Sequence, residues 1–140
     1  MNLYHFAQNI LESPDIEEKL RHPGKIDYSP STEVFTLQLS PQRSSAYAFG
    51  KKESKKLQLG ELNSERDRGL LLLMFMNHEL LAIELMALAI LKFHHSVPEA
   101  FLRGLVQTII DEQKHCRLYL KRLQELNCEA GDLPLSSFFW

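Results

Sequence analysis

The sequence predicts an all-α protein built around a hairpin of two long helices. Residues 65–93 carry an apolar run long enough for a helix of about eight turns. Residues 94–97 interrupt this pattern, and Pro98 then opens a second helical pattern that runs to about residue 126. Because the interruption is so short, the two helices are expected to lie antiparallel.

The first 62 residues are expected to wrap the hairpin. Residues 2–21 show helical patterns in two short pieces, and the following stretch is rich in proline, glycine and serine. Within it, residues 33–39 alternate between apolar and polar side chains, which fits either a short strand or an extended arm. The predicted organisation is an N-terminal segment (1–62), the hairpin (63–128) and an extended apolar tail (129–140).

Composition narrows the class of protein. A chain of 140 residues with 44% apolar side chains fits one domain, and its formal net charge of -2 gives no basic excess that would indicate nucleic acid. Two cysteines are too few for a disulfide scaffold, and no signal peptide is visible, so a cytoplasmic protein is expected. The apolar run holds Glu79 and Glu84, which are costly in lipid, so a soluble helix with no membrane role is predicted.

The second helix carries the spacing Glu112-x-x-His115. Side chains three residues apart lie on one helix face, and here that face is predicted to be buried together with Phe101 and Tyr119. A carboxylate and an imidazole in such a place must be paired, hydrogen-bonded or bound to metal. Glu-x-x-His is the ligand pair of di-iron and di-manganese carboxylate proteins, although the pair also fits a purely structural role.

The geometry of the hairpin predicts which residue of the first helix faces Glu112. The connecting residues are centred at 95.5, which is also the midpoint between Glu79 and Glu112, so these two side chains are expected at equal depth. Glu84 is displaced along the axes by about 7–8 Å and lies about 140° round the helix from Glu79. We therefore expect Glu79, Glu112 and His115 to form half of a dinuclear carboxylate site. Glu84 is instead expected to cap, to pair with a basic side chain or to meet another subunit.

Three neighbours of this half-site have weaker expectations. Asp111 is a candidate to hold the second ring nitrogen of His115. His78 points about 100° away from Glu79, which favours a histidine at a helix interface over a ligand. Tyr119 lies one turn beyond His115 and is expected in the core or beside the metal.

Several blocks of the chain resemble one family. The blocks ELLAIEL and DEQKH, with the tail GDLPLSSFFW, resemble the ferritin-like proteins known as domain of unknown function 455 (DUF455), although Asn77 and Cys116 stand where that family often has His and Phe. The resemblance implies a ferritin-like four-helix bundle, in which a second helix pair carries another Glu and another Glu-x-x-His. It also implies a distant similarity to tRNA-hydroxylating di-iron monooxygenases.

Two functions follow as hypotheses. The first is a di-iron oxidase or oxygenase, with manganese as the other candidate metal, bound at Glu79, Glu112 and His115. The second is a helical interaction module in which this half-site is vestigial. Residues 70–91 are apolar on every face and need neighbours all round, so either a missing C-terminal helix pair or a homodimer is expected to complete the core. Nucleic acid is not indicated, and tRNA is left open as a partner.

Overall fold

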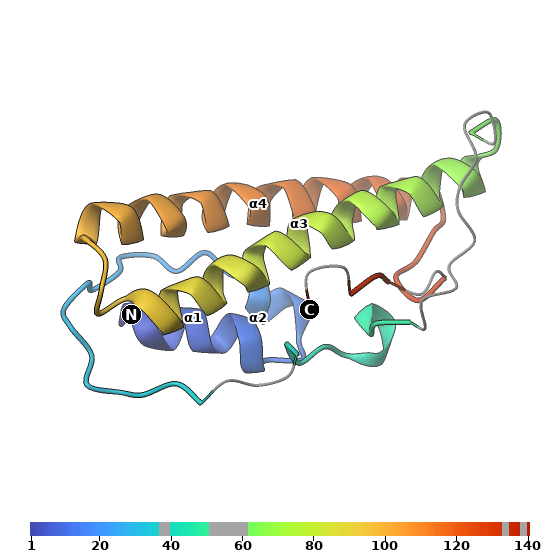
Figure 1. Ribbon diagram of the computed structural model, residues 1–140. Coiled ribbons are helices and arrows are strands. Elements are labelled where there is room, and N and C mark those ends of the chain that lie inside the picture. The colour runs from blue at the N-terminus through green and yellow to red at the C-terminus, as the bar shows by residue number, and fades with distance from the viewer. Residues whose placement is uncertain (37–39, 51–61, 133–134, 138–139) are drawn as a thin grey trace.

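The computed structural model describes all residues except 37–39, 51–61, 133–134 and 138–139. The all-α prediction is confirmed, since the described residues form helices and no strand. In chain order the elements are α1 (Leu3–Glu12), α2 (Ile16–Lys19), the short 3₁₀ turn η1 (Ser45–Tyr47), α3 (Glu65–Phe93) and α4 (Glu99–Glu125) (Figure 1).

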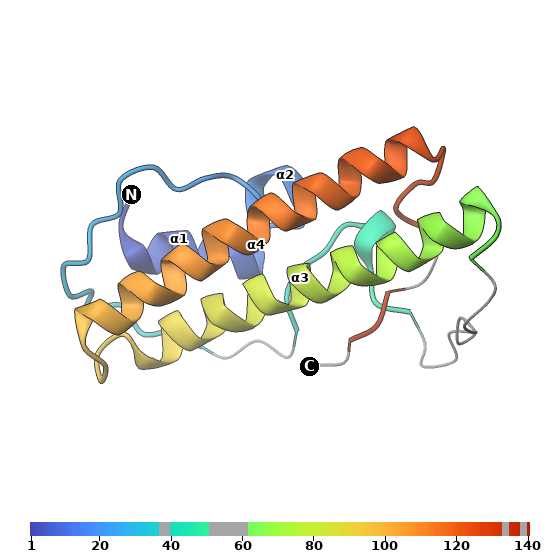
Figure 2. The same ribbon diagram turned by 90° about the horizontal axis from the view of Figure 1, so that it is seen from above.

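Helices α3 and α4 form the predicted hairpin and lie side by side along their length (Figures 1 and 2). The side chain of Ser64 caps α3 by accepting a hydrogen bond of 3.1 Å from the backbone N–H of Asp67. At its other end, His94 Nδ1 lies 3.1 Å from the carbonyl oxygens of both Ile90 and Leu91. The imidazole Nδ1 thus lies within hydrogen-bond distance of two carbonyls in the last turn of α3, although that of Ile90 also accepts the backbone N–H of His94. Helix α4 begins directly after Pro98.

The N-terminal helices cover one side of this hairpin. Helix α1 packs against α3 and is capped by the side chain of Asn2, and α2 is capped by that of Asp15. Two short helices were predicted within residues 2–21, and α1 and α2 lie there. The buried residues of α1 are Leu3, Tyr4, Phe6, Ala7, Ile10 and Leu11.

The remaining described segments lie on the same side as α1. Residues 40–50 and the tail run beneath α3 in Figure 1, where Gly50 donates a backbone hydrogen bond of 2.9 Å to the carbonyl of Leu135. Residues 33–36 belong to no strand, and the rest of the predicted strand or arm, 37–39, lies outside the described residues. Among the elements described, none covers the opposite side of the hairpin (Figures 1 and 2).

Helix α3 is long and apolar enough to cross a membrane by length and composition, a test that the core helix of a soluble protein also passes. Two polar side chains near its centre distinguish a core helix from a membrane span. Asn77 and Glu84 are 2% and 0% exposed, and protein groups hydrogen-bond both of them. The helix therefore has the features of a protein core.

One prediction for α4 is wrong in its helical phase. Phe101 and His115 were expected in the buried face, and both are exposed, whereas Gln113 is buried. Gln113 Nε2 donates a hydrogen bond of 2.8 Å to the carbonyl oxygen of Lys19. Because α2 docks against α4 here, the buried face of α4 includes Gln113. The buried residues of α4 are Leu102, Val106, Ile109, Gln113, Cys116 and Leu123.

Candidate metal centre

Glu79, Glu112 and His115 meet at the middle of the hairpin. Glu79 comes from α3, and one turn of α4 presents both Glu112 and His115 toward it. One ligand atom from each of the three side chains lies within 4.8 Å of the other two. No other group of three His, Cys, Asp or Glu side chains meets this spacing in the part of the chain that the structure describes.

Within the cluster, the two α4 side chains are directly hydrogen-bonded. His115 Nδ1 lies 2.7 Å from Glu112 Oε2, so a proton is held between these two atoms. The pair is i, i+3 on one helix, which fixes the relative position of carboxylate and imidazole before anything binds. A cation that took both atoms as ligands would replace that proton.

The surroundings of Glu79 disfavour the ionised form of its carboxylate. Its pKa is raised above the usual value of 4.5, mainly by burial, and further by the hydrogen bond and negative charge of Glu112, while His115 opposes the shift. Two carboxylates so close together are unfavourable when both are ionised. A cation between them relieves this repulsion, so the charge balance favours a positively charged ligand.

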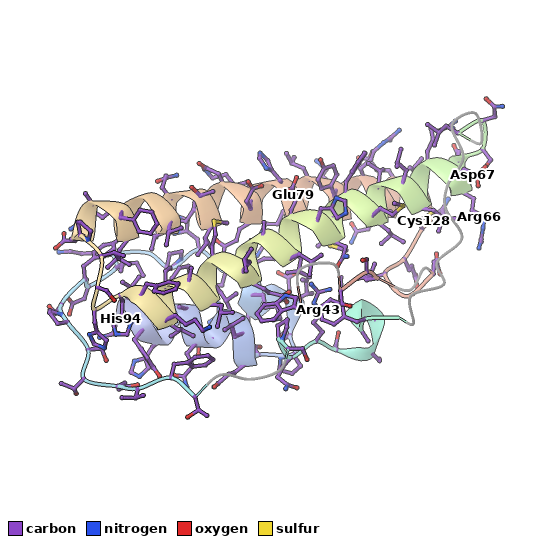
Figure 3. The ribbon with its side chains drawn as sticks, viewed as in Figure 1. Arg43, Arg66, Asp67, Glu79, His94 and Cys128 are labelled. Atoms are coloured by element: carbon purple, nitrogen blue, oxygen red, sulfur yellow. The ribbon has the colours of Figure 1, made fainter. Side chains whose placement is uncertain are left out.

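The cluster opens to one side. Glu79 and Glu112 are half-buried, and the side chain of His115 is 51% exposed. The rings of Phe75 and Tyr119 pack beside it with their centroids 6.2 Å apart. Figure 3 shows Glu79 between α3 and α4, on the far side of α3 from Arg43. A cation at this cluster would therefore meet the three donors on one side and be free of them on the other.

The donor set fits iron or manganese. Two carboxylates and one imidazole suit divalent metals of this hardness, whereas thiolates would favour softer metals. The nearest cysteine, Cys116, is buried beneath the cluster, and its Sγ lies 3.6 Å from the carbonyl oxygen of Met76. Burial raises the pKa of the Cys116 thiol, and the charges of Glu79 and Glu112 add to the shift. The thiol thus stays protonated, and it is not one of the three side chains that meet the metal-site spacing.

Glu84 belongs to a second, separate cluster on the other side of α3. Its carboxylate is fully buried and accepts hydrogen bonds from Arg43 Nε at 3.0 Å and Arg43 Nη2 at 2.7 Å. Lys19 Nζ lies 3.1 Å from Glu84 Oε1 and also donates to the carbonyl of Ile10. Of the three fates expected for Glu84, pairing with basic side chains is the one the structure shows.

Asn77 extends this second cluster to the C-terminal tail. Its Oδ1 accepts 2.7 Å from Arg43 Nη1, and its Nδ2 donates 2.9 Å to the carbonyl of Ser136. Arg43 also lies over the ring of Phe49, with Cζ 4.2 Å from the ring centroid. Two buried cations, one carboxylate and one amide thus join α2, the 40–50 segment, α3 and the tail. The cluster carries one positive charge more than negative.

The other residues singled out from the sequence take separate places. Asp111 accepts hydrogen bonds from Gln107 at 3.1 Å and Lys114 at 2.8 Å on the outer side of α4. These bonds, chiefly that from Lys114, hold the pKa of the Asp111 carboxyl below its usual value. His78 is exposed on α3. Tyr119 is half-buried against Phe75, next to the metal-site cluster.

Sequence reasoning missed the burial of Lys19 and Arg43. A carboxylate inside an apolar run indicates that some cation must meet it, and this signal was present at Glu84. The partners themselves carry no local signal, because Lys19 ends a four-residue helix and Arg43 lies in an irregular segment. Their separations from Glu84 are 65 and 41 residues.

Comparison with known proteins gives one match. The family model described as "Protein of unknown function (DUF455)" matches residues 6–140. No curated protein and no solved structure matches the chain. The family match covers both clusters and every described helix apart from the first residues of α1.

Proposed function

The chain belongs to the DUF455 family, and we propose that it is a metal protein in which Glu79, Glu112 and His115 form one half of a di-metal carboxylate centre. Iron is the proposed metal, and manganese is the alternative. The observation that carries the proposal is that two carboxylates and an imidazole converge within 4.8 Å at the middle of a two-helix hairpin.

The arrangement of the donors supports a dinuclear centre. Four-helix carboxylate proteins use one Glu from each of two helices and a Glu-x-x-His from each of the other two. Helix α3 supplies the single Glu79, and α4 supplies Glu112-x-x-His115. The ferritin-like resemblance of the sequence points the same way. We propose that a second helix pair with matching donors completes the coordination shell.

The chain's own residues have defined tasks in this proposal. A bound pair of redox-active metals would supply electron transfer to dioxygen, which suits an oxidase or oxygenase. Glu79 and Glu112 would provide the negative charge that binds cations, and His115 would serve as a nitrogen ligand after its Nδ1 proton is released to solvent. Phe75 and Tyr119 lie one helical turn from Glu79 and His115, so the pair of rings flanks the site. Two buried, free cysteines fit a reducing cytoplasm, where we propose the protein works.

Metal analysis of the protein purified without chelator tests the proposal. We expect iron or manganese in the wild type, and its loss in Glu79→Gln, Glu112→Gln and His115→Ala. Glu125→Gln is the matched control, because Glu125 lies on α4 away from the cluster and pairs with Arg122 at 2.6 Å. For redox function, we expect oxygen uptake when ferrous iron is added anaerobically and air is then admitted.

A second function is favoured by the open side of the hairpin. Phe75 and Phe101 are 42% and 54% exposed on the face that holds the cluster, and apolar side chains gathered on one exposed face mark an interaction site. A helical interaction module with a vestigial half-site would use these residues for binding and would not need metal. The interaction module would be supported over the metal protein by two results together. The wild-type protein would contain no metal, and its melting temperature would not change when ferrous iron or manganese is added at neutral pH.

A further inference from the structure

Two buried polar side chains of α3 lie opposite the metal-site ligand of the same helix. Asn77 and Glu84 are two turns apart, so they lie within about 20° of each other round α3. Glu79 lies about 140° from Glu84 and about 160° from Asn77. Figure 3 shows the same arrangement, with Glu79 and Arg43 on opposite sides of the helix. Whatever fixes the rotation of α3 on the side of Arg43 therefore also fixes the direction of Glu79.

Apolar burial does little to fix this rotation. Leu80 and Ile83 are 0% exposed, whereas Phe75 and Leu85, which are also large and apolar, are both 42% exposed. A helix with a single apolar stripe has one favoured orientation against its neighbours, but a helix that is apolar all round does not. The rotation of α3 therefore depends on groups that can bond in only one orientation.

Arg43 makes such bonds to two turns of α3 at once. Its Nε and Nη2 donate to the two carboxylate oxygens of Glu84 at 3.0 and 2.7 Å, and its Nη1 donates 2.7 Å to Asn77 Oδ1. The side chain of Arg43 is 3% exposed, and it is held in its own segment by the carbonyl of Tyr47 and the ring of Phe49. Because a guanidinium is planar and rigid, the three bonds to α3 form together only when both α3 side chains face it.

A small rotation of α3 would be enough to disrupt the metal site. Side-chain ends lie about 5–6 Å from the axis of a helix, so a rotation of about 20° moves them by about 2 Å. Distances between a metal and its ligands vary by only about 0.2 Å. Glu112 and His115 share one turn of α4 and keep their spacing, whereas Glu79 reaches the cluster from the other helix. The place of Glu79 therefore depends on the rotation of α3.

We propose that Arg43 is a positioning residue, which fixes the rotation of α3 and so presents Glu79 to the two ligands of α4. Arg43 acts through Glu84 and Asn77 and not by contact with the metal. Buried polar groups serve here to specify one orientation, which apolar side chains of the same size would not do. This inference rests on the proposed function, because it needs the cluster to bind metal.

The main test replaces the buried ionic group by apolar side chains. The triple variant Lys19→Met, Arg43→Met and Glu84→Met leaves no unpaired buried charge among these positions, and Asn77 keeps its hydrogen bond to the carbonyl of Ser136. Replacing a whole buried ionic group in this way often preserves or raises stability. We therefore expect a melting temperature in chelator at least as high as that of the wild type.

Manganese affinity is the readout that a merely structural role would not change. Chelator-treated protein is titrated with manganese, and the free Mn²⁺ is measured by its electron paramagnetic resonance signal. We expect the triple variant to bind manganese at least about tenfold more weakly than the wild type, as is usual when a group that orients a metal ligand is lost. If Arg43 served stability alone, a stably folded triple variant would bind manganese as tightly as the wild type.

Two single variants complete the experiment. Arg43→Lys keeps the positive charge beside Glu84, but an ammonium group cannot reproduce the rigid fork that joins Glu84 to Asn77. It should also bind manganese at least about tenfold more weakly, and it decides the question if the triple variant does not fold. Leu102→Ala is the matched control, because Leu102 is 4% exposed and lies about 15 Å from Glu112 along α4. It should lower the melting temperature through lost packing and leave the manganese affinity unchanged.

The outcomes separate this inference from the proposed function. A wild-type chain that binds no manganese overturns the proposed function itself. A wild type that binds manganese, with folded Arg43 variants whose affinity stays within about tenfold of it, overturns the positioning role and leaves the metal site intact. Equal losses of affinity in Leu102→Ala and Arg43→Lys also overturn the positioning role, because affinity would then follow stability alone.

Discussion

Replacing Glu84 by Gln should strongly destabilise this protein, although Glu84 is predicted to bind no metal. The substitution keeps the size of the side chain and removes its charge. Arg43 and Lys19 would then be two buried cations with no anion between them, and the amide group of Gln would present donors to the donors of Arg43. Breaking a buried ion pair in this way costs about 3–5 kcal/mol.

This cost is large against the stability of a domain. Folded domains are stable by about 5–15 kcal/mol, so the variant should lose about a fifth or more of that margin. The loss corresponds to a fall of about 10–15 °C in melting temperature for a chain of this length. In urea, it corresponds to a fall of about 2 M in the unfolding midpoint.

Urea unfolding followed by circular dichroism at 222 nm measures this effect, with the protein kept in chelator. Glu79→Gln is the matched control on the same helix. It removes one of two mutually repelling carboxylates, so the apo protein should be at least as stable as the wild type. A shift of less than about 0.5 M in the urea midpoint is close to the precision of such measurements. A Glu84→Gln midpoint that close to the wild type would refute the assignment of Glu84 as the counter-ion of two buried cations.

Two further predictions concern packing and pH. A Cβ built on Gly69 meets Cys128 Sγ at 2.1 Å, so Gly69→Ala should destabilise the fold by about 1–3 kcal/mol in thermal unfolding, whereas Gly104→Ala, with nothing within 4 Å, should stabilise it by up to about 1 kcal/mol. A Gly69→Ala variant as stable as the wild type would show that α3 and Cys128 can move apart freely. The pKa of Lys19 is lowered from 10.5, mainly by burial, with Glu84 opposing the shift. Between the lowered pKa and 10.5 the unfolded chain binds more protons than the folded one, so the unfolding free energy of the wild type, minus that of Lys19→Met, should rise with pH up to about 10.5. A difference that is flat or falls across that range would contradict the assignment.

The hairpin and the choice of Glu79 followed from local rules. A short connection and a fixed rise per residue set which side chains face each other, so Glu79 and Glu112 could be paired from numbers alone. The structure does bring these two together with His115. That they bind metal stays a prediction.

The buried face of α4 and the partners of Glu84 followed from contacts that no local pattern carries. The phase of α4 depends on Gln113 meeting the carbonyl of Lys19, 94 residues earlier in the chain. The periodicity of a sequence shows which face of a helix is apolar. Which face becomes buried also depends on the elements that pack against the helix. The same holds for Arg43, whose burial depends on Glu84 and Asn77 together.

The cluster at Glu84 has a consequence for the order in which the chain folds. Lys19 and Arg43 are 65 and 41 residues from Glu84, whereas α3 and α4 are joined by only the five residues 94–98. Closing the longest of these loops costs about 2 kcal/mol more chain entropy than closing the connection of the hairpin. The hairpin should therefore form first, with Glu84 still in water, and the N-terminal segment should dock afterwards. In the native state the same segment should be the first to detach, and a protease should cut there while α3 and α4 remain paired.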